Sequence, residues 1–268
     1  MYPEIFSIGN LVIHSYGLMI ALAVVVVALA LYREAPREKM NPDYVLEAVI
    51  VSAFSGVIGA RTLYMILNWD YYGVHFFSAF FTRFEGLSFY GGLFGGVIAL
   101  IFWSNWRGVG LLKLFDLLAP YLALGYAFGR IGCFLNGCCY GRESDLPWAL
   151  PASAADTILR HPVQLYAALL AIIIFIILKL LRPHRPFVGF IFISLFGFYG
   201  LLRFTTEFFR YGEAVALGLT LAQLFSLGLV IISLAIIIAF SGGLEVFSGL
   251  FKRPRLKKDR KPKKRGRK

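Results

Sequence analysis

The sequence predicts an all-α, polytopic integral membrane protein with about seven transmembrane helices. Of its 268 residues, 59% are hydrophobic and 16% are charged, whereas soluble domains carry about 25% charged residues. A soluble fold of this size could not bury that much apolar surface, so the composition excludes a soluble enzyme, and it also excludes a disordered chain. The spans must be helical because the bilayer core offers no hydrogen-bond partner to an open backbone group.

Seven stretches are apolar over a length that crosses the roughly 30 Å hydrocarbon core of a bilayer. We place them at residues 16–32, 46–67, 87–104, 112–135, 163–181, 187–208 and 217–240. Pro36 and Pro42 separate the first two spans, a turn at 105–110 separates the third from the fourth, and Pro183 with Pro186 separates the fifth from the sixth. No internal repeat with a period of about 20–50 residues is present.

The distribution of Lys and Arg predicts the orientation of the helices, because cytoplasmic loops carry an excess of these residues. Residues 1–15 contain none. The loops after the first, third and fifth spans contain Arg33, Arg37, Lys39, Arg107, Lys113, Lys179, Arg182 and Arg185, whereas the opposite loops contain only Arg83, Arg142, Arg160 and Arg210. We therefore expect the N-terminus outside and the C-terminus in the cytoplasm. The first span has no basic segment before it and is not expected to be a cleaved signal peptide.

Most of the net charge of +12 lies in one segment. Residues 252–268 contain twelve Lys or Arg and one acid, so that residues 1–251 are almost neutral. We expect a transmembrane domain over 1–251 and a disordered cytoplasmic tail over 252–268 that contacts anionic lipid headgroups. Nucleic-acid binding is not expected, since no aromatic residue is interleaved with these charges.

Three arginines, Arg61, Arg130 and Arg203, fall inside or at the edge of predicted spans. An arginine at the centre of a transmembrane helix costs about 2.5–3.5 kcal/mol on the insertion scale. Such residues usually face the interior of the bundle and serve a site. The alternative, in which the side chain extends to the nearer membrane surface, suits Arg61 in part.

The sixth span ends with a cluster of charged and aromatic residues. Tyr199, Arg203, Glu207 and Arg210 are spaced so that one helical face carries all four. Glu207 can pair with either arginine, which lowers the cost of removing them from water. Because one carboxylate leaves one arginine unpaired, this face predicts an anionic ligand, and Arg is well suited to bind phosphate.

Two glycine-rich segments lie on the same predicted outer side. One is 129–141, which contains Arg130, and the other is 86–92, which contains Tyr90. Glycines let backbone N–H groups approach a ligand closely, although transmembrane helices also use them for close packing. The combined pattern predicts an outward-facing cavity in the bilayer that holds a phosphate and leaves room for acyl chains.

These residues make the chain resemble the bacterial phosphatidylglycerol–prolipoprotein diacylglyceryl transferases over about residues 5–240. The matching segments are His14–Met19, Ser88–Leu93, Asp116 with Ala119 and Pro120, Gly129–Gly141, Arg160–Tyr166, and Arg203 with Glu207 and Arg210. The resemblance implies transfer of the diacylglyceryl group of phosphatidylglycerol to the lipobox cysteine of a prolipoprotein signal peptide, with release of glycerol 1-phosphate. It also implies a bacterial cytoplasmic (inner) membrane enzyme whose active site faces outward.

The resemblance also assigns roles to individual residues. Arg130 and Arg203 are expected to bind the lipid phosphate, and Glu207 to orient Arg203 and Arg210. Tyr90, Arg130 and Arg203 are the predicted catalytic residues. The predicted substrate-binding residues are Arg130, Arg203, Glu207, Arg210, Tyr16, Tyr199, Asn136, Gly91, Gly92 and His161.

The chain departs from the common family pattern at three positions. Cys133 stands where the family most often has Asn, Cys138 where it has Glu, and Tyr90 where it has His. Because that His is a natural base for the substrate thiol, we expect Tyr90 either to accept the thiol proton or to position the thiol.

Some alternatives remain open. Cys133, Cys138 and Cys139, with His161, could be zinc ligands, form a disulfide, supply a covalent nucleophile, or pack in a glycine-rich loop; we favour packing and expect no metal or cofactor. For His161, anchoring the start of the fifth span competes with a role in the site. A small-anion transporter is the rival function, but it predicts an internal repeat. A lipid-group transferase with another acceptor is a further alternative.

Overall fold

The computed structural model describes residues 4–8, 11–73, 80, 86–153 and 156–241. The seven predicted spans are confirmed, because seven of the described helices are long and apolar enough to cross a membrane. They are α1 (Ser15–Glu34), α2 (Pro42–Leu67), α5 (Phe89–Arg107), α6 (Leu111–Leu135), α7 (Val163–Leu181), α8 (Phe190–Glu207) and α9 (Leu221–Phe240). The predicted tail at 252–268 and Arg83 lie outside the described residues.

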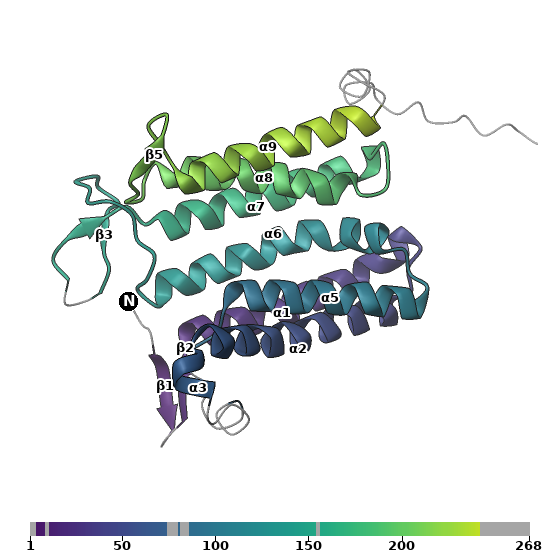
Figure 1. Ribbon diagram of the computed structural model, residues 1–268, viewed down its shortest axis with the longest axis horizontal. Helices are drawn as coiled ribbons and strands as arrows, with labels where there is room; N and C mark the ends of the chain where they lie inside the picture. The colour runs from purple at the N-terminus through teal and green to yellow at the C-terminus, as the bar shows by residue number, and fades with distance from the viewer. Residues whose placement is uncertain (1–3, 9–10, 74–79, 81–85, 154–155, 242–268) are drawn as a thin grey trace, which may run out of the picture.

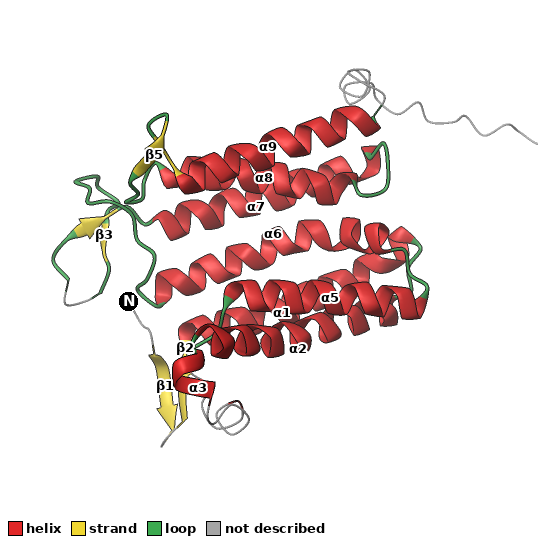
Figure 2. Cartoon of the chain, in the orientation of Figure 1, coloured by secondary structure: helices red, strands yellow, loops and turns green. Residues whose placement is uncertain are grey.

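Short elements connect the long helices. One helical turn, α3 (Trp69–Tyr72), follows α2, and the 3-10 helices η1 (Ala35–Glu38) and η3 (Arg182–His184) follow α1 and α7. The antiparallel hairpins pair β1 (Glu4–Ile8) with β2 (Leu11–His14), β3 (Leu150–Pro151) with β4 (Leu159–Arg160), and β5 (Ala214–Ala216) with β6 (Leu219–Thr220). All three hairpins lie at one end of the bundle, which we call the hairpin end (Figure 2).

Local capping bonds and one left-handed glycine explain where three helices begin differently from the sequence prediction. α2 begins at Pro42, four residues early, because the side chain of Asn41 accepts a hydrogen bond from the Asp43 N–H at 2.9 Å. α9 begins at Leu221, four residues late, where Thr220 and Gln223 form a reciprocal capping box. α8 begins at Phe190, after Gly189 at φ 100°.

Helix α6 occupies the middle of the bundle and packs against α1, α7 and α8 (Figure 1). Two further pairs, α2 with α5 and α8 with α9, pack closely through small residues. A Cβ atom on Gly200 of α8 would lie 2.7 Å from the Ser226 carbonyl oxygen of α9, so this contact requires glycine. The backbones of neighbouring helices therefore touch, as in other membrane bundles.

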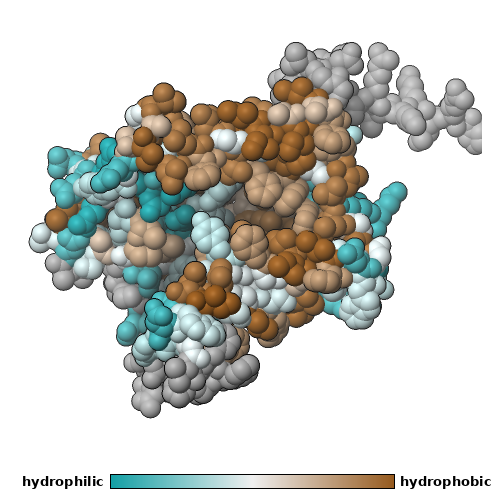
Figure 3. Space-filling view, viewed as in Figure 1, coloured by the Kyte–Doolittle hydropathy of each residue, from teal (hydrophilic) through white to brown (hydrophobic). Residues whose placement is uncertain are grey.

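The outer surface of the bundle agrees with a membrane environment. Figure 3 shows apolar residues across the middle of this face and hydrophilic residues gathered at its two ends. Phe94 and Phe102 of α5 and Phe225 of α9 are exposed large apolar side chains. A soluble protein would rarely expose so much contiguous apolar surface.

At the end opposite the hairpins, ion pairs join three parts of the chain. Arg182, only 5% exposed, pairs with Glu34 at 2.8 Å and with Glu38 at 3.0 Å. Lys179 also pairs with Glu34, and Arg185 pairs with Glu38 at 2.7 Å. These cations, which the sequence analysis used only to orient the helices, therefore also tie the end of α1 to the end of α7 and tie η1 to η3.

Asp116 is fully buried in α6 and accepts hydrogen bonds from the first turn of α8. Its Oδ2 accepts from the Gly189 N–H at 2.7 Å and its Oδ1 from the Phe192 N–H at 3.0 Å. A helix N-terminus carries unpaired N–H groups and a partial positive charge, so a carboxylate there stabilises the helix. Asp116 thereby determines where the beginning of α8 lies along α6.

We predict that Asp116→Ala lowers the free energy of unfolding by about 2–4 kcal/mol, because two buried N–H groups lose their acceptor. The stability of Asp116→Asn should lie between that of the unchanged protein and that of Asp116→Ala, since an amide oxygen can replace only one of the carboxylate oxygens. The measurement is denaturation of the purified protein in detergent. Asp145→Ala, at an exposed loop position, is the control, and equal stability of the Asp116→Ala and Asp145→Ala proteins would contradict the prediction.

Candidate active site

The predicted arginines lie near the hairpin-end termini of two neighbouring helices. Arg130 is in the last two turns of α6, and Arg203 is in the last turns of α8. Both helices run toward the hairpin end, and they contact each other along the bundle. The two cations predicted to bind phosphate therefore come from adjacent helices.

Tyr126 connects the arginines. The Arg130 guanidinium lies over the Tyr126 ring at 4.8 Å from its centroid. The Tyr199 ring of α8 meets Tyr126 edge-on, with 5.7 Å between the centroids. Arg130 and Arg203 both interact electrostatically with Tyr126. Tyr126 is the residue that the sequence analysis missed, although it lies one turn before Arg130 on the same helical face.

Glu207 holds Arg203 in place. Its Oε2 lies 3.0 Å from Nη2 of Arg203, and the residue is only 7% exposed. Since α8 ends at Glu207, Arg210 is not on the helical face that the sequence predicted; it lies in the turn that follows, with its N–H donating to the Glu207 carbonyl at 3.0 Å. Within the described residues, Glu207 forms its ion pair with Arg203.

The charge balance of this region is positive. Arg130, Arg203 and Arg210 contribute three guanidinium groups, and within the described part of the chain only the Arg203 group has an ion-pair partner. Positive charges without counter-charges near a membrane-spanning segment are unfavourable unless a ligand compensates them. The arrangement is therefore suited to bind an anion.

Loop 136–162 is anchored at this site to the turn that follows α8. Arg142 donates its Nε to the Arg210 carbonyl at 2.8 Å and its N–H to the Phe209 carbonyl at 2.8 Å. Arg142 also accepts from the His161 N–H at 3.0 Å. These bonds position Arg210 and the cysteines of the same loop relative to α8.

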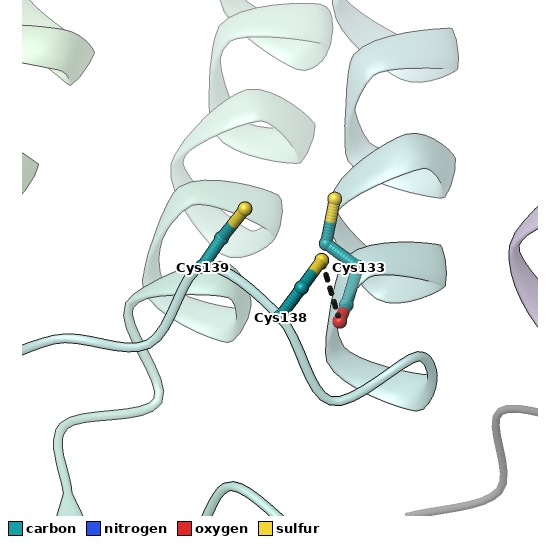
Figure 4. A group of neighbouring side chains, drawn as sticks. All are labelled: Cys133, Cys138 and Cys139. Carbon is teal, nitrogen blue, oxygen red and sulfur yellow. Dashed lines mark hydrogen bonds between the residues drawn. The ribbon is translucent and has the colours of Figure 1, made fainter. Parts of the chain in front are cut away.

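The end of α6 brings the three cysteines together. The Cys138 N–H donates to the Cys133 carbonyl at 3.1 Å and the Gly137 N–H to the Phe134 carbonyl at 3.2 Å, with Gly137 at φ 74°. This is the Schellman motif, which returns the chain over the last turn of a helix. The Sγ atoms of Cys133, Cys138 and Cys139 all lie within 4.8 Å of one another (Figure 4). The packing interpretation did not predict this convergence.

Two of these thiols have opposite pKa shifts. A hydrogen bond with Cys133, another with Cys138, and the positive charges of Arg130 and Arg210 hold the pKa of Cys139 well below its ordinary value. Burial raises the pKa of Cys138. Cys139 is therefore the thiol expected to carry negative charge at neutral pH.

Tyr16 and Asn136 lie beside this cysteine group. Tyr16, at the start of α1, interacts electrostatically with Arg130 and with all three cysteines. Its ring packs so closely on α6 that a Cβ atom on Gly132 would lie 3.1 Å from Tyr16 Cδ2. Asn136 ends α6 and hydrogen-bonds to Cys138 through its side chain. The structure thus brings Tyr16 to Arg130, Tyr199 to Tyr126 and Asn136 to the cysteines, while their roles in substrate binding stay predictions.

The glycine-rich start of α5 is arranged differently. Tyr90 is 65% exposed, and among the described residues its ring contact is with Phe89, with no bond to an arginine. A Cβ atom on Gly91 would lie 2.3 Å from the Gly59 carbonyl oxygen of α2. Gly92 lies beside α2 as well, at Gly56. The structure supplies a packing reason for Gly91, while substrate binding by Gly91 and Gly92 stays a prediction.

His161 lies in an aromatic group at the hairpin end. Its Nδ1 is 3.2 Å from the Tyr166 hydroxyl, and its ring centroid is 5.1 Å from that of Phe209. The Val163 N–H donates to the His161 carbonyl at 2.9 Å, at the start of α7. These contacts agree with the anchoring interpretation, and a role of His161 in substrate binding stays a prediction.

Comparison with known proteins gives a consistent result. The sequence profile of the family described as prolipoprotein diacylglyceryl transferase matches residues 3–239. A protein named phosphatidylglycerol–prolipoprotein diacylglyceryl transferase from Geobacter sulfurreducens is 36% identical over 231 residues, which cover 84% of this chain and 88% of the relative. A protein of the same name from Dehalococcoides mccartyi is 35% identical, over 87% of this chain and 91% of the relative. Another from Clostridioides difficile is 31% identical, over 83% of this chain and 88% of the relative.

We predict that Gly91→Ala destabilises the protein by about 1–3 kcal/mol, because the new methyl group must separate α2 from α5. Detergent-solubilised protein is compared with Gly228→Ala, where an added Cβ meets nothing within 4 Å. A Gly91→Ala protein as stable as this control would show that close packing does not explain the glycine.

A second prediction concerns thiol reactivity. At about pH 6.5 an ordinary thiol with a pKa near 8.5 is almost fully protonated. In chelator-treated protein at this pH, iodoacetamide should modify Cys139 faster than Cys138. The reason is that a lowered pKa keeps the thiolate present at lower pH. Mass spectrometry of the alkylated peptides measures both rates in one sample, and equal rates at the two positions would contradict the assigned pKa shifts.

Proposed function

The chain belongs to the prolipoprotein diacylglyceryl transferase family and is an enzyme of that activity, and we propose that Arg130 and Arg203 hold the phosphate of phosphatidylglycerol during the transfer. The enzyme moves the diacylglyceryl group from phosphatidylglycerol to the cysteine thiol of a prolipoprotein and releases glycerol 1-phosphate. This activity is the first step of bacterial lipoprotein maturation.

The excess positive charge at the hairpin end is the observation that carries the proposal. Arg130 lies over the Tyr126 ring, Arg203 interacts electrostatically with Tyr126, and Glu207 holds Arg203 at 3.0 Å. A guanidinium group can donate two parallel hydrogen bonds to phosphate oxygens. Two such groups on neighbouring helices form a clamp for a lipid headgroup that enters from the bilayer.

The clamp supports the reaction chemistry directly. The substrate sulfur forms a bond to C3 of the glyceryl group while the bond from C3 to the phosphate oxygen breaks. The electron pair leaves with glycerol phosphate, so negative charge increases on the oxygen that departs. Donors already positioned around that oxygen stabilise the transition state, because they need no reorganisation during the reaction.

Other predicted residues complete the proposed site. Tyr16 and Tyr199 contact the lipid, Asn136 lies in the same loop as the cysteines, and Arg210 adds positive charge on the loop side. Tyr90, exposed at the hairpin end of α5, accepts the proton of the substrate thiol or positions the thiol. We also propose that Gly91, Gly92 and His161 bind substrate.

The location of the enzyme follows from the same features. It is a multi-pass membrane protein. We place it in the bacterial cytoplasmic membrane with the hairpin end outward, since the loops rich in Lys and Arg lie at the opposite end. The acceptor is then the lipobox cysteine of a prolipoprotein signal peptide, and residues 252–268 contact anionic lipid headgroups on the inner side. The small-anion transporter is not favoured, given the family of the chain.

We predict that Arg203→Ala lowers kcat/KM for diacylglyceryl transfer at least about 100-fold, because one donor to the departing phosphate is lost. Arg130→Ala should have an effect of similar size, and Arg203→Lys should recover part of the activity, since it keeps the charge but not the paired donors. The assay incubates purified protein with labelled phosphatidylglycerol and a lipobox peptide, and it measures thioether-linked lipid and released glycerol phosphate.

Arg37→Ala is the matched control, because Arg37 is an exposed arginine at the opposite end of the bundle. It should leave the transfer rate unchanged. All variants are first checked for membrane insertion. Full activity of a correctly inserted Arg203→Ala protein would remove Arg203 from the clamp.

A further inference from the structure

The three cysteines are held together by the backbone and not only by their side chains. The Schellman motif places Cys138 over Cys133, and the buried Gln164 of α7 donates its Nε2 to the Cys138 carbonyl at 2.5 Å. Cys139 has φ 67°, a left-handed conformation that costs a non-glycine residue roughly 1–2 kcal/mol. That conformation turns the Cys139 side chain toward the other two sulfurs (Figure 4).

Packing does not account for this geometry. A packing residue needs neither convergence with two other thiols nor a strained backbone, and Cys139 is exposed. The group also lies in a charged region, because Arg130 and Arg210 interact electrostatically with Cys139. The chain contains three cysteines in total, so all of its sulfhydryl groups meet at the end of α6.

The separation of the sulfurs favours a metal ion over a disulfide. Four thiolates around Zn²⁺ at about 2.3 Å have sulfur–sulfur separations of roughly 3.8 Å. The observed limit of 4.8 Å requires a contraction of at most about 1 Å to reach that value. A disulfide would join only two of the three sulfurs and would leave the third thiol unpaired.

The geometry points to a three-thiolate site for a thiophilic divalent cation of the zinc class, formed by Cys133, Cys138 and Cys139, in which the fourth coordination position binds the acceptor thiol. Within the described residues, no His, Asp or Glu joins the three sulfurs, so one position stays open. Zinc sites with three protein ligands and an open position are typically catalytic. The binding of the acceptor thiol at the fourth position rests on the proposed function.

The charges of such a site balance. Three thiolates and a divalent ion carry a net charge of −1, the bound acceptor thiolate makes it −2, and Arg130 and Arg210 supply two positive charges. A thiol that binds the ion loses its proton to solvent and stays nucleophilic as a thiolate. The sulfur then forms its bond to C3 as glycerol phosphate leaves, and the resulting thioether is a weaker ligand than the thiolate. Metal binding would thus supply the activation of the thiol that the exposed Tyr90 must otherwise provide.

Metal binding is tested first, without turnover. Purified, chelator-treated protein is titrated with Zn²⁺ or Co²⁺ alone, and bound metal is measured by mass spectrometry and by the sulfur-to-cobalt absorption band. We expect about one ion per chain for the unmodified protein. Cys139→Ser should lose most of the binding, and His161→Ala should retain it, because His161 is not in the cysteine group. Absence of the cobalt band would overturn the metal site. So would a disulfide between two of the cysteines that forms when the reduced protein is mildly reoxidised in the presence of metal.

The open position is tested on the cobalt-loaded protein. A lipobox peptide with its cysteine should change the visible cobalt spectrum, whereas the same peptide with serine should not. An unchanged spectrum with the cysteine peptide would overturn thiol coordination. Diacylglyceryl transfer is measured on the same preparation, so a protein that transfers lipid but binds no metal refutes this inference alone, whereas a protein that binds metal but transfers no lipid refutes the proposed function.

Discussion

The buried contact between Asp116 and the first turn of α8 determines the position of the whole site. Helices α6 and α8 run in the same direction, and Asp116 accepts hydrogen bonds from the Gly189 and Phe192 N–H groups. Arg130 lies fourteen residues after Asp116, and Arg203 lies fourteen residues after Gly189. At 1.5 Å per residue, both helices rise about 21 Å over that distance. Hydrogen bonds at one end of the bundle therefore bring two arginines to the same level at the other.

This arrangement explains how the bundle tolerates three arginines near a membrane-spanning region. Each guanidinium group lies near a helix end, where polar groups and loop backbone are available. Arg203 is paired with Glu207, Arg130 lies over Tyr126, and Arg210 is in a turn tied down by Arg142. Arg61 is similar: it donates to the Gly86 carbonyl at 3.2 Å and lies over the Tyr72 ring. Positive charge is thus fixed in place before any ligand binds.

The sequence predicted the spans well because about twenty consecutive apolar residues indicate that a helix lies in the hydrocarbon of a bilayer and not in water. It also predicted the convergence of Arg130, Arg203, Tyr16 and Tyr199, since helix polarity places all four at one end. It placed the end of α8 within one residue, at 208 against Glu207, and yet put Arg210 on the helical face. It could not predict that Gly91 packs on α2 or that Asp116 caps α8, because these depend on contacts between distant segments. The meeting of the three cysteines depends on a left-handed residue, Cys139, which no hydrophobic pattern encodes.

Arg130 lies between the two parts of the site, the aromatic and arginine residues next to α8 and the three cysteines at the end of α6. Its guanidinium lies over Tyr126 on the side of α8, and it also interacts electrostatically with Cys133 and Cys139 on the side of the loop. An in-line displacement requires the attacking sulfur and the departing oxygen on opposite sides of C3. A planar group with five donors can contact a phosphate held toward Arg203 while it faces a thiolate in the loop, whereas a lysine ammonium acts as a single point charge. The position of Arg130 between Tyr126 and the cysteines therefore favours arginine over lysine.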